Sequence, residues 1–264
     1  MGKRIAVVGT GALGGYVGGV LNGERALSAL LAARRDKKRV DMIDIDDARD
    51  KVLWGRERRR AMDDNEKKAL AWHEAGHAIV GAVLDDGTVP VHKVTIIPRG
   101  RALGVTMSLP STDRYSYDRT YMLSQISMLF GGRIAEEVFM NQMTTGASND
   151  FERATQIARD MVMRYGMSEA LGPMVYAENE GEVFLGRSVT KTTNMSESTM
   201  KKVDDEVRSI IDSQYNLARR LIEENADKMH AMANALIEWE TIDSDQLDDI
   251  MAGRPPRPPK EVSS

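Results

Sequence analysis

Hydrophobic residues recur at helical spacing over most of the chain and alternate with polar residues only in short runs. Residues three and four apart line one face of an α-helix, so this spacing predicts amphipathic helices. Two β-rich runs, 91–97 and 102–109, flank Pro98-Arg99-Gly100 and predict a hairpin. The expected fold class is mainly α, with a small β-hairpin or sheet. We expect helices over residues 64–84, 118–140, 150–165, 196–225 and 244–251.

A charged segment precedes the main helical region. Ala, Leu and Arg dominate residues 26–35, and Asp46-Asp47 predicts the start of a second helix that runs to Trp54. A charged linker follows, and Asp63-Asp64-Asn65 predicts the N-cap of the next helix. The Pro-rich end of the chain is expected to stay extended and to join no packed element. The predicted parts are an unassigned leader (1–25), a helical segment (26–62), a main domain (63–252) and a tail (253–264).

The first 25 residues differ from the rest in composition. Lys3 and Arg4 precede an apolar stretch that is rich in glycine. Gly9-Thr10-Gly11-Ala12-Leu13-Gly14 fits the G-x-G-x-x-G pattern of a dinucleotide-binding loop, but the β-α-β alternation that should follow is lacking. A membrane anchor or signal segment is a second reading, and a Gly-rich leader on the surface is a third, which we favour.

The composition restricts the chemistry that the chain can perform. Its 264 residues include no cysteine, which excludes disulfides, thiolate metal sites and a cysteine nucleophile. Any metal must therefore be held by carboxylates and by the four histidines. The formal net charge is −4, and basic residues are interleaved with acidic ones almost everywhere. We therefore expect no nucleic-acid partner.

The segment His73-Glu74-Ala75-Gly76-His77 matches the H-E-x-x-H pattern of zinc hydrolases. Residues four apart project from one face of a helix, so the two imidazoles can reach a single Zn²⁺ ion. Zinc held by three protein ligands keeps a fourth position for water and lowers the pKa of that water. Glu74, one residue from the first ligand, is predicted to be the catalytic base that takes the proton.

A third zinc ligand must come from elsewhere, and spacing alone does not choose it. Isolated histidines on a strand or a helix more often fill the core or the surface than bind a metal. Asp150 ends the small polar loop that begins at Thr144 and leads into a predicted helix. From these residues alone, Asp150 is equally well read as a helix N-cap or as a ligand. The candidates are His92, His230, Glu136, Glu137 and Asp150.

With these motifs, the sequence resembles the peptidase domain of the FtsH family of membrane-anchored, ATP-dependent zinc metalloproteases. The resemblance runs from about Ala26 to Arg254 and includes the metal helix and the loop Thr144-Thr145-Gly146-Ala147-Ser148-Asn149-Asp150. Several sequence blocks follow one another here in the same order as in the family, which is more specific than one short motif. Besides the metal helix and this loop, the blocks are Leu129-Phe130-Gly131-Gly132-Arg133-Ile134-Ala135-Glu136-Glu137, Arg164-Tyr165-Gly166-Met167-Ser168, Leu171-Gly172-Pro173 and Gly181-Glu182-Val183-Phe184-Leu185-Gly186-Arg187.

The resemblance implies a helical zincin-type peptidase domain whose three zinc ligands are His73, His77 and Asp150. It also implies that a glutamate of the Glu136-Glu137 pair lies near the site and orients a ligand. The strand that contains Gly104-Val105-Thr106-Met107 is expected to border the active-site cleft, where an extended substrate can pair with it. Glu74 keeps its expected role as the base.

The implied activity is that of a zinc metalloendopeptidase that cleaves unfolded or membrane-extracted polypeptides. A homo-hexameric ring and association with a membrane are implied as well, in the cytoplasm or at the cytoplasmic face of the inner membrane. Two alternatives stay open: a catalytically idle assembly partner or fragment of such a protease, and a nucleotide-dependent oxidoreductase suggested by the leader. The oxidoreductase alternative is the weaker one, because it needs a domain that the sequence does not contain.

The sequence departs from the family pattern in its first part. Residues 26–62 resemble only the end of the lid of an AAA-type ATPase, and the leader does not fit the family. The printed sequence contains no G-x-x-x-x-G-K-S/T loop, whose backbone N–H groups and lysine would hold phosphates. We therefore expect this chain to cleave loosely folded proteins slowly without ATP, and neither to bind nor to hydrolyse ATP.

Overall fold

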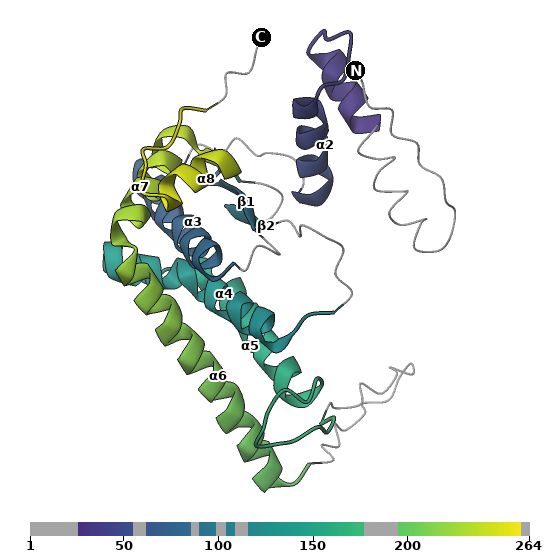
Figure 1. Cartoon of the computed structure of the whole chain (residues 1–264), viewed down its shortest axis with the longest axis vertical. Helices are drawn as coiled ribbons and strands as arrows, with labels where there is room; N and C mark the ends of the chain where they lie inside the picture. Colours follow the sequence, from purple (N-terminus) through teal and green to yellow (C-terminus); the bar gives the residue numbers. More distant parts are fainter. Residues whose placement is uncertain are drawn as a thin grey trace. The chain divides into compact units, whose positions relative to one another are not determined.

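The computed structural model describes residues 26–54, 62–85, 90–98, 104–108, 116–176 and 195–259. Three parts that the sequence singled out lie outside these residues: the leader over 1–25, the turn at 99–103 and the block at 181–187. The chain forms two units, which are described separately (Figure 1). The smaller contains residues 26–54, and the larger contains the helices and strands that follow residue 62.

The smaller unit is a pair of helices joined by a charged turn. Its first helix covers residues 26–34 and its second, α2, is Met42–Trp54. The side chain of Asp44 is fully buried, and its carboxylate accepts hydrogen bonds from Arg35 at 2.8 Å and from Lys37 at 3.3 Å. A buried charge needs such partners, so these ion pairs orient the turn against α2.

The prediction that Asp46-Asp47 starts the second helix is wrong. Helix α2 begins at Met42, and the carboxylate of Asp41 accepts a hydrogen bond from the backbone N–H of Asp44 at 3.1 Å. Several aspartates in this segment are good N-caps, so local sequence does not decide among them. The contacts of Asp44 with residues seven and nine positions earlier decide the start of the helix, because they place this residue inside the first turn.

The larger unit is mainly α-helical with one small antiparallel sheet, which confirms the predicted fold class (Figure 1). Among the described residues, none of the helices combines the length and the apolar character needed to cross a membrane. The helices are α3 (Asp64–Leu84), α4 (Arg119–Met140), α5 (Ser148–Met163), α6 (Glu197–Glu224), α7 (Ala226–Trp239) and α8 (Ser244–Met251), with a 3₁₀ turn, η1, at Thr145–Ala147. The strands are β1 (Val91–Thr95), β2 (Val105–Ser108) and β3 (Thr241–Asp243).

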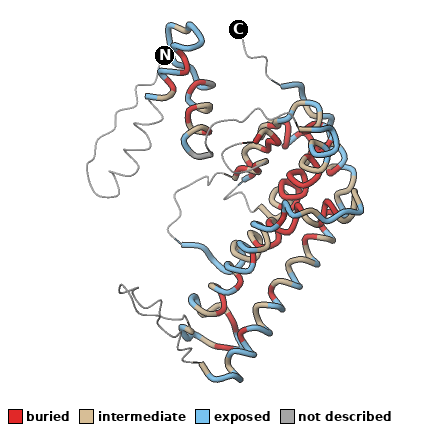
Figure 2. The backbone as a smooth tube through the Cα atoms, turned by 180° about the vertical axis from the view of Figure 1, so that it is seen from behind, coloured by how far each residue is buried: buried red, intermediate tan, exposed pale blue. Residues whose placement is uncertain are grey.

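Helix α3 forms the centre of the larger unit. Asp63 caps it by accepting a hydrogen bond from the backbone N–H of Glu66 at 2.8 Å, as the sequence predicted. Every residue from Ala71 to Val80 is buried, and Figure 2 shows buried backbone concentrated in the central helices. A helix that is buried on all sides must be surrounded by other elements. For α3 these are α4, α6, α7 and the sheet.

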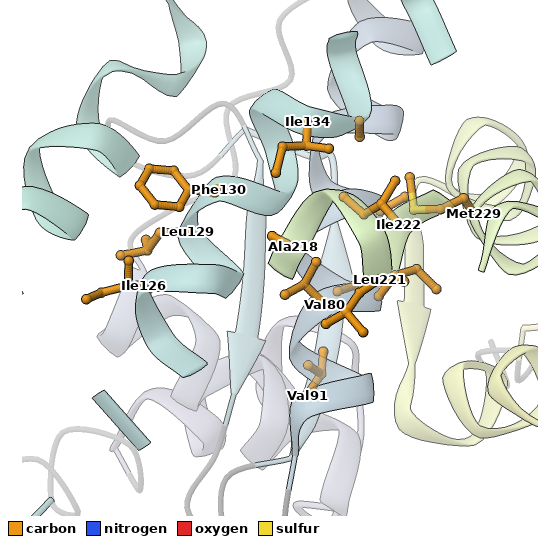
Figure 3. Packing of buried hydrophobic residues seen from close by; sticks show 14 of the residues in the cluster. Val80, Val91, Ile126, Leu129, Phe130, Ile134, Ala218, Leu221, Ile222 and Met229 are labelled. Atoms are coloured by element: carbon orange, nitrogen blue, oxygen red, sulfur yellow. The ribbon is translucent and has the colours of Figure 1, made fainter. Parts of the chain in front are cut away.

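Helices α3 and α4 cross at a pair of glycines. A Cβ atom added to Gly76 would overlap the backbone carbonyl of Gly131, and one added to Gly131 would overlap the backbone of Gly76. The two backbones can therefore approach only because neither residue has a side chain. Around the crossing, aliphatic and aromatic side chains from α3, α4, α6 and α7 pack together (Figure 3).

The sheet has the strand order β2-β1-β3, with both pairs antiparallel. Strand β3 was not predicted, because it has three residues and its Thr241 pairs with Thr95 of β1, 146 positions earlier in the sequence. The hydroxyl of Thr95 on β1 donates to the carbonyl of Glu240 at 3.1 Å and fixes this pairing. Strand β2 lies at an edge of the sheet and packs against α3.

The prediction that the Pro-rich tail joins no packed element is wrong for its described part. The carboxylate of Asp249 on α8 accepts hydrogen bonds from Arg254 Nη2 at 2.8 Å and from Arg257 Nε at 2.7 Å. Gln246 Nε2 donates to the carbonyl of Arg257 at 3.0 Å. Extended proline-rich backbone has no internal hydrogen bonds, so these contacts with α8 hold the tail in place.

We expect Asp249→Asn to lower the melting temperature by a few degrees at pH 7, because the amide cannot pair with two guanidinium groups. Hydrogen bonds from Arg257 and then from Arg254 hold the pKa of Asp249 well below its ordinary value of 3.8. The stability that this carboxylate contributes is therefore present above pH 3.8 and is lost as the pH falls toward its lower pKa in the folded state.

Thermal unfolding followed by circular dichroism measures this effect. The matched control is Asp248→Asn, which changes the exposed neighbour on the same helix and should leave the melting temperature unchanged. The difference between Asp249→Asn and the unchanged chain should shrink below pH 3.8. Equal effects of the two substitutions at pH 7 would contradict the role of the Asp249 ion pairs.

Candidate metal centre

His73 and His77 face each other from successive turns of α3. Both side chains are 9% exposed, and their Nε2 atoms lie 3.0 Å apart. The ring planes are nearly perpendicular, at 83°, so the two nitrogens approach without stacking of the rings. The i, i+4 spacing on a helix produces this arrangement, as the sequence predicted.

The other ring nitrogen of each histidine contacts a hydrogen-bond acceptor. Nδ1 of His73 lies 2.8 Å from Oε1 of Glu136, and Nδ1 of His77 lies 2.8 Å from the backbone carbonyl of Met128. A carboxylate and a carbonyl accept hydrogen bonds, so we assign the proton of each neutral ring to Nδ1. Each Nε2 then presents a lone pair toward the other ring. Two facing lone pairs repel each other unless a cation lies between them.

Asp150 supplies a negative charge at the same point. Its Oδ2 atom lies 3.3 Å from Nε2 of His73 and 3.4 Å from Nε2 of His77. Helix α5 begins at Ser148 and has Ala147 as its N-cap, so Asp150 lies in the first turn and does not cap the helix. The N-cap reading of Asp150 is therefore wrong. Its side chain points at the two histidines instead.

The charges of the cluster favour a cation between these three side chains. Burial lowers the pKa of His73, but its contacts with Asp150 and Glu136 outweigh burial and raise the pKa to about 9. Burial raises the pKa of Asp150, but the bonds to His73 and His77 outweigh it and hold that pKa below its ordinary value. The surroundings thus stabilise a positive charge next to an ionised carboxylate.

The three atoms have the separations that a tetrahedral zinc ion requires. With metal–ligand bonds of about 2.0–2.1 Å, two ligand atoms of a tetrahedron lie about 3.3 Å apart. The observed separations are 3.0, 3.3 and 3.4 Å. Two imidazoles and one carboxylate also suit zinc in their chemistry. His73, His77 and Asp150 therefore fit the metal, and three protein ligands leave one position for water.

Glu74 lies beside this cluster and is buried, with 5% of the residue exposed. Its Oε2 atom accepts a hydrogen bond from the hydroxyl of Thr106 on β2 at 2.8 Å. Burial raises the pKa of Glu74 above its ordinary value, and the charges of His77 and His73 only partly oppose this shift. A carboxylate whose pKa is raised accepts a proton more readily.

Glu136 on α4 connects His73 of α3 with the segment that leads to Asp150. Its Oε1 atom binds His73, and its Oε2 atom accepts a hydrogen bond from the backbone N–H of Thr144 at 2.8 Å. Arg133 donates to the carbonyl of the same threonine at 2.6 Å. Burial raises the pKa of Glu136, but these bonds outweigh burial and lower it. Glu136 thus remains ionised and orients His73.

The remaining ligand candidates lie outside the cluster. Glu137 on α4 pairs with Tyr215 and Arg219 of α6, and His230 on α7 packs edge-on against Trp72 and Phe139. His92 lies on β1, away from the facing nitrogens. Sequence reasoning also missed Thr106, Arg133 and the carbonyl of Met128. Arg133 lies in a block that resembles the family and Thr106 in the strand expected to border the cleft, but no local pattern indicates what these residues contact.

We expect Gly132→Ala to weaken metal binding by at least about tenfold, the lower range for a disturbed outer contact of a metal ligand. A Cβ atom at Gly132 would lie 2.5 Å from Cε1 and Nε2 of His73 and 2.7 Å from Nε2 of His77. Both rings would have to move. A titration of the purified protein with zinc in the presence of a competing chelator measures the affinity.

The matched control for this experiment is Gly81→Ala on α3, whose added Cβ would meet side chains of Val91 and Met128 at 3.0 and 3.2 Å. Side-chain atoms can give way, so zinc affinity should stay within about twofold of that of the unchanged chain. If Gly132→Ala binds zinc as tightly as Gly81→Ala does, the close packing of Gly132 on the histidines is unimportant for the metal.

Comparison with known proteins identifies similar sequences for the greater part of the chain. A family model described as peptidase family M41 matches residues 60–250. The ATP-dependent zinc metalloprotease FtsH of Cupriavidus metallidurans is 60% identical over 234 residues, which are 88% of this chain and 36% of that protein. The proteins of the same name from Photobacterium profundum and Magnetococcus marinus are 52% and 51% identical, over 85% and 86% of this chain. The chain thus spans about a third of the length of these relatives.

Proposed function

Because the chain belongs to peptidase family M41, we propose that it is a zinc metalloendopeptidase whose metal is held by His73, His77 and Asp150. The observation that carries the proposal is the convergence of Nε2 of both histidines and Oδ2 of Asp150 within 3.4 Å of one another. The relatives named above are called zinc metalloproteases, which supports the choice of zinc. Their names also describe dependence on ATP, which concerns those longer proteins.

The residues of the chain have separate roles in the proposed reaction. A zinc ion held by His73, His77 and Asp150 would supply an activated water and a charge that polarises the peptide carbonyl. Glu74 takes a proton from the attacking water as the new C–O bond forms, and returns it to the nitrogen as the C–N bond breaks. Glu136 keeps His73 in the orientation that presents Nε2, and its contact with Thr144 keeps the Asp150 loop close.

The proposed substrates are unfolded or membrane-extracted polypeptides. Strand β2 is at an edge of the three-stranded sheet, and Thr106 of this strand contacts Glu74. An extended polypeptide that adds to such an edge forms backbone hydrogen bonds, which require little of its side chains. The proposal therefore includes broad specificity for extended segments. A homo-hexamer at the cytoplasmic face of the inner membrane, or in the cytoplasm, completes the proposal by resemblance to the family.

The experiment that tests this function combines elemental analysis with cleavage of fluorescently labelled casein by the purified chain. We expect about one zinc per chain and slow cleavage that does not change when ATP is added. A chelator should abolish cleavage and added zinc should restore it, whereas a stably folded protein should stay intact. Bound zinc without cleavage of casein would favour the idle assembly partner. Tight binding of ATP by calorimetry would overturn the expected independence from nucleotide.

A further inference from the structure

The carboxylate of Glu74 is held from one side by the segment at the start of β2. The hydroxyl of Thr106 donates to Oε2 at 2.8 Å and also lies 3.3 Å from the backbone carbonyl of Glu74. A hydroxyl has a single proton, and the shorter bond to a charged acceptor is the stronger of the two. Among the residues that the structure describes, Oε1 of Glu74 receives no hydrogen bond.

Gly104 makes room for this arrangement. A Cβ atom at this position would lie 2.5 Å from Oε1, 2.8 Å from Cγ and 2.9 Å from Cδ of Glu74. Real Cβ atoms do not approach other heavy atoms so closely, so any side chain here would push the carboxylate away from its position. Gly104 immediately precedes β2 and Thr106 is the second residue of that strand, so both contacts with Glu74 come from the same short segment.

We propose that Thr106 is a positioning residue for peptide cleavage: its hydroxyl holds one oxygen of Glu74 in place and leaves the other free to exchange the proton. The inference rests on the proposed function, because Glu74 is the base of that reaction. A hydrogen bond at one oxygen restrains the rotation of a carboxylate about its last torsion, so the other oxygen keeps a preferred direction during proton transfer. The close fit of Gly104 against the other oxygen supports the same orientation.

Substitutions at Thr106 separate a positioning role from a merely structural one. Thr106→Val keeps the shape and removes the hydroxyl, and we expect it to lower kcat about tenfold, as the loss of a hydrogen bond to a charged group does. KM and zinc content should not change, because the hydroxyl binds neither substrate nor metal. Thr106→Ser keeps the hydroxyl and should restore kcat to within about twofold. If Thr106→Val does not fold, Thr106→Ala replaces it.

The matched control is Thr95→Val on the neighbouring strand. The hydroxyl of Thr95 is buried and bonds to Glu240 and Thr241, away from the metal cluster. Its loss should lower the melting temperature and leave kcat unchanged. If Thr106→Val resembles Thr95→Val in both respects, Thr106 has only a structural role and the inference is wrong. Failure of the serine variant to restore kcat would also overturn it.

Crystal structures of the zinc-loaded chain and of the Thr106→Val and Thr106→Ser variants show the conformation of Glu74 directly, without relying on cleavage. We expect one conformation of Glu74 in the unchanged chain and in Thr106→Ser, and several in Thr106→Val. A single unchanged conformation in Thr106→Val would overturn the inference whatever the activity. If the unchanged chain cleaves no casein, the proposed function fails, and the conformation of Glu74 still decides whether Thr106 holds it.

Discussion

Replacing Glu74 with Gln should reduce casein cleavage at least 10²-fold, the lower range for the loss of a general base, while zinc stays bound. The amide has nearly the shape of the carboxylate and can still accept the hydrogen bond from Thr106 through its carbonyl oxygen. It cannot take a proton from water. Because His73, His77 and Asp150 are unchanged, the three proposed ligand atoms remain in place.

The control for this experiment is Glu66→Gln, which makes the same chemical change at an exposed position in the first turn of α3. It should leave both zinc content and turnover as they are in the unchanged chain. Cleavage rates are measured at saturating zinc, with bound metal determined by elemental analysis of the same samples. Near-normal turnover by Glu74→Gln would show that Glu74 is not the general base.

The second large effect is expected from Asp150→Ala, which should lose most of its zinc on dialysis and lose cleavage with it. Two histidines would remain, and a zinc site needs three protein ligands to keep its metal. Zinc stabilises a folded protein in proportion to how tightly it binds the folded state. Added zinc should therefore raise the melting temperature of the unchanged chain and have little effect on the variant.

Asp160→Ala is the matched control, because it removes an aspartate from the opposite end of the same helix. Asp160 bonds to Gln156 and Arg164 and lies in the last turn of α5. This control should keep about one zinc per chain and respond to added zinc in the same way as the unchanged chain. Unchanged zinc in Asp150→Ala would show that another carboxylate completes the site, and the neighbouring Glu136 would be the first to replace.

The metal helix could be predicted from sequence because all its signals are local. Asp63 caps the helix, the two histidines are four residues apart, and Glu74 follows the first of them. The place of Asp150 could not be derived in this way, since its loop and a simple N-cap have the same composition. Only the arrangement of α4 and α5 against α3 brings its Oδ2 atom to the two histidines.

The features that the sequence did not predict correctly have a common physical cause. Each depends on a contact between residues that are separated in the sequence, or on which of several equally suitable residues makes that contact. The start of α2 depends on the ion pairs of Asp44, and the tail is held by Asp249 on α8. Strand β3 is too short to have a recognisable alternation of its own and is defined by its pairing with β1. Thr106 lies within a predicted β-rich run, but its contact with Glu74 exists only in the folded chain.

The strand order β2-β1-β3 has a consequence for the order in which the chain folds during its synthesis. Thr95 and its partner Glu240 are separated by 145 residues, so β1 emerges from the ribosome long before β3 exists. Helix α7, which helps to enclose α3, is made just before β3. Contacts this distant form late, because a long loop must close first. The helix with the two histidines therefore completes its surroundings only after residue 239 has been made, whereas all three proposed zinc ligands are present once residue 150 has been made.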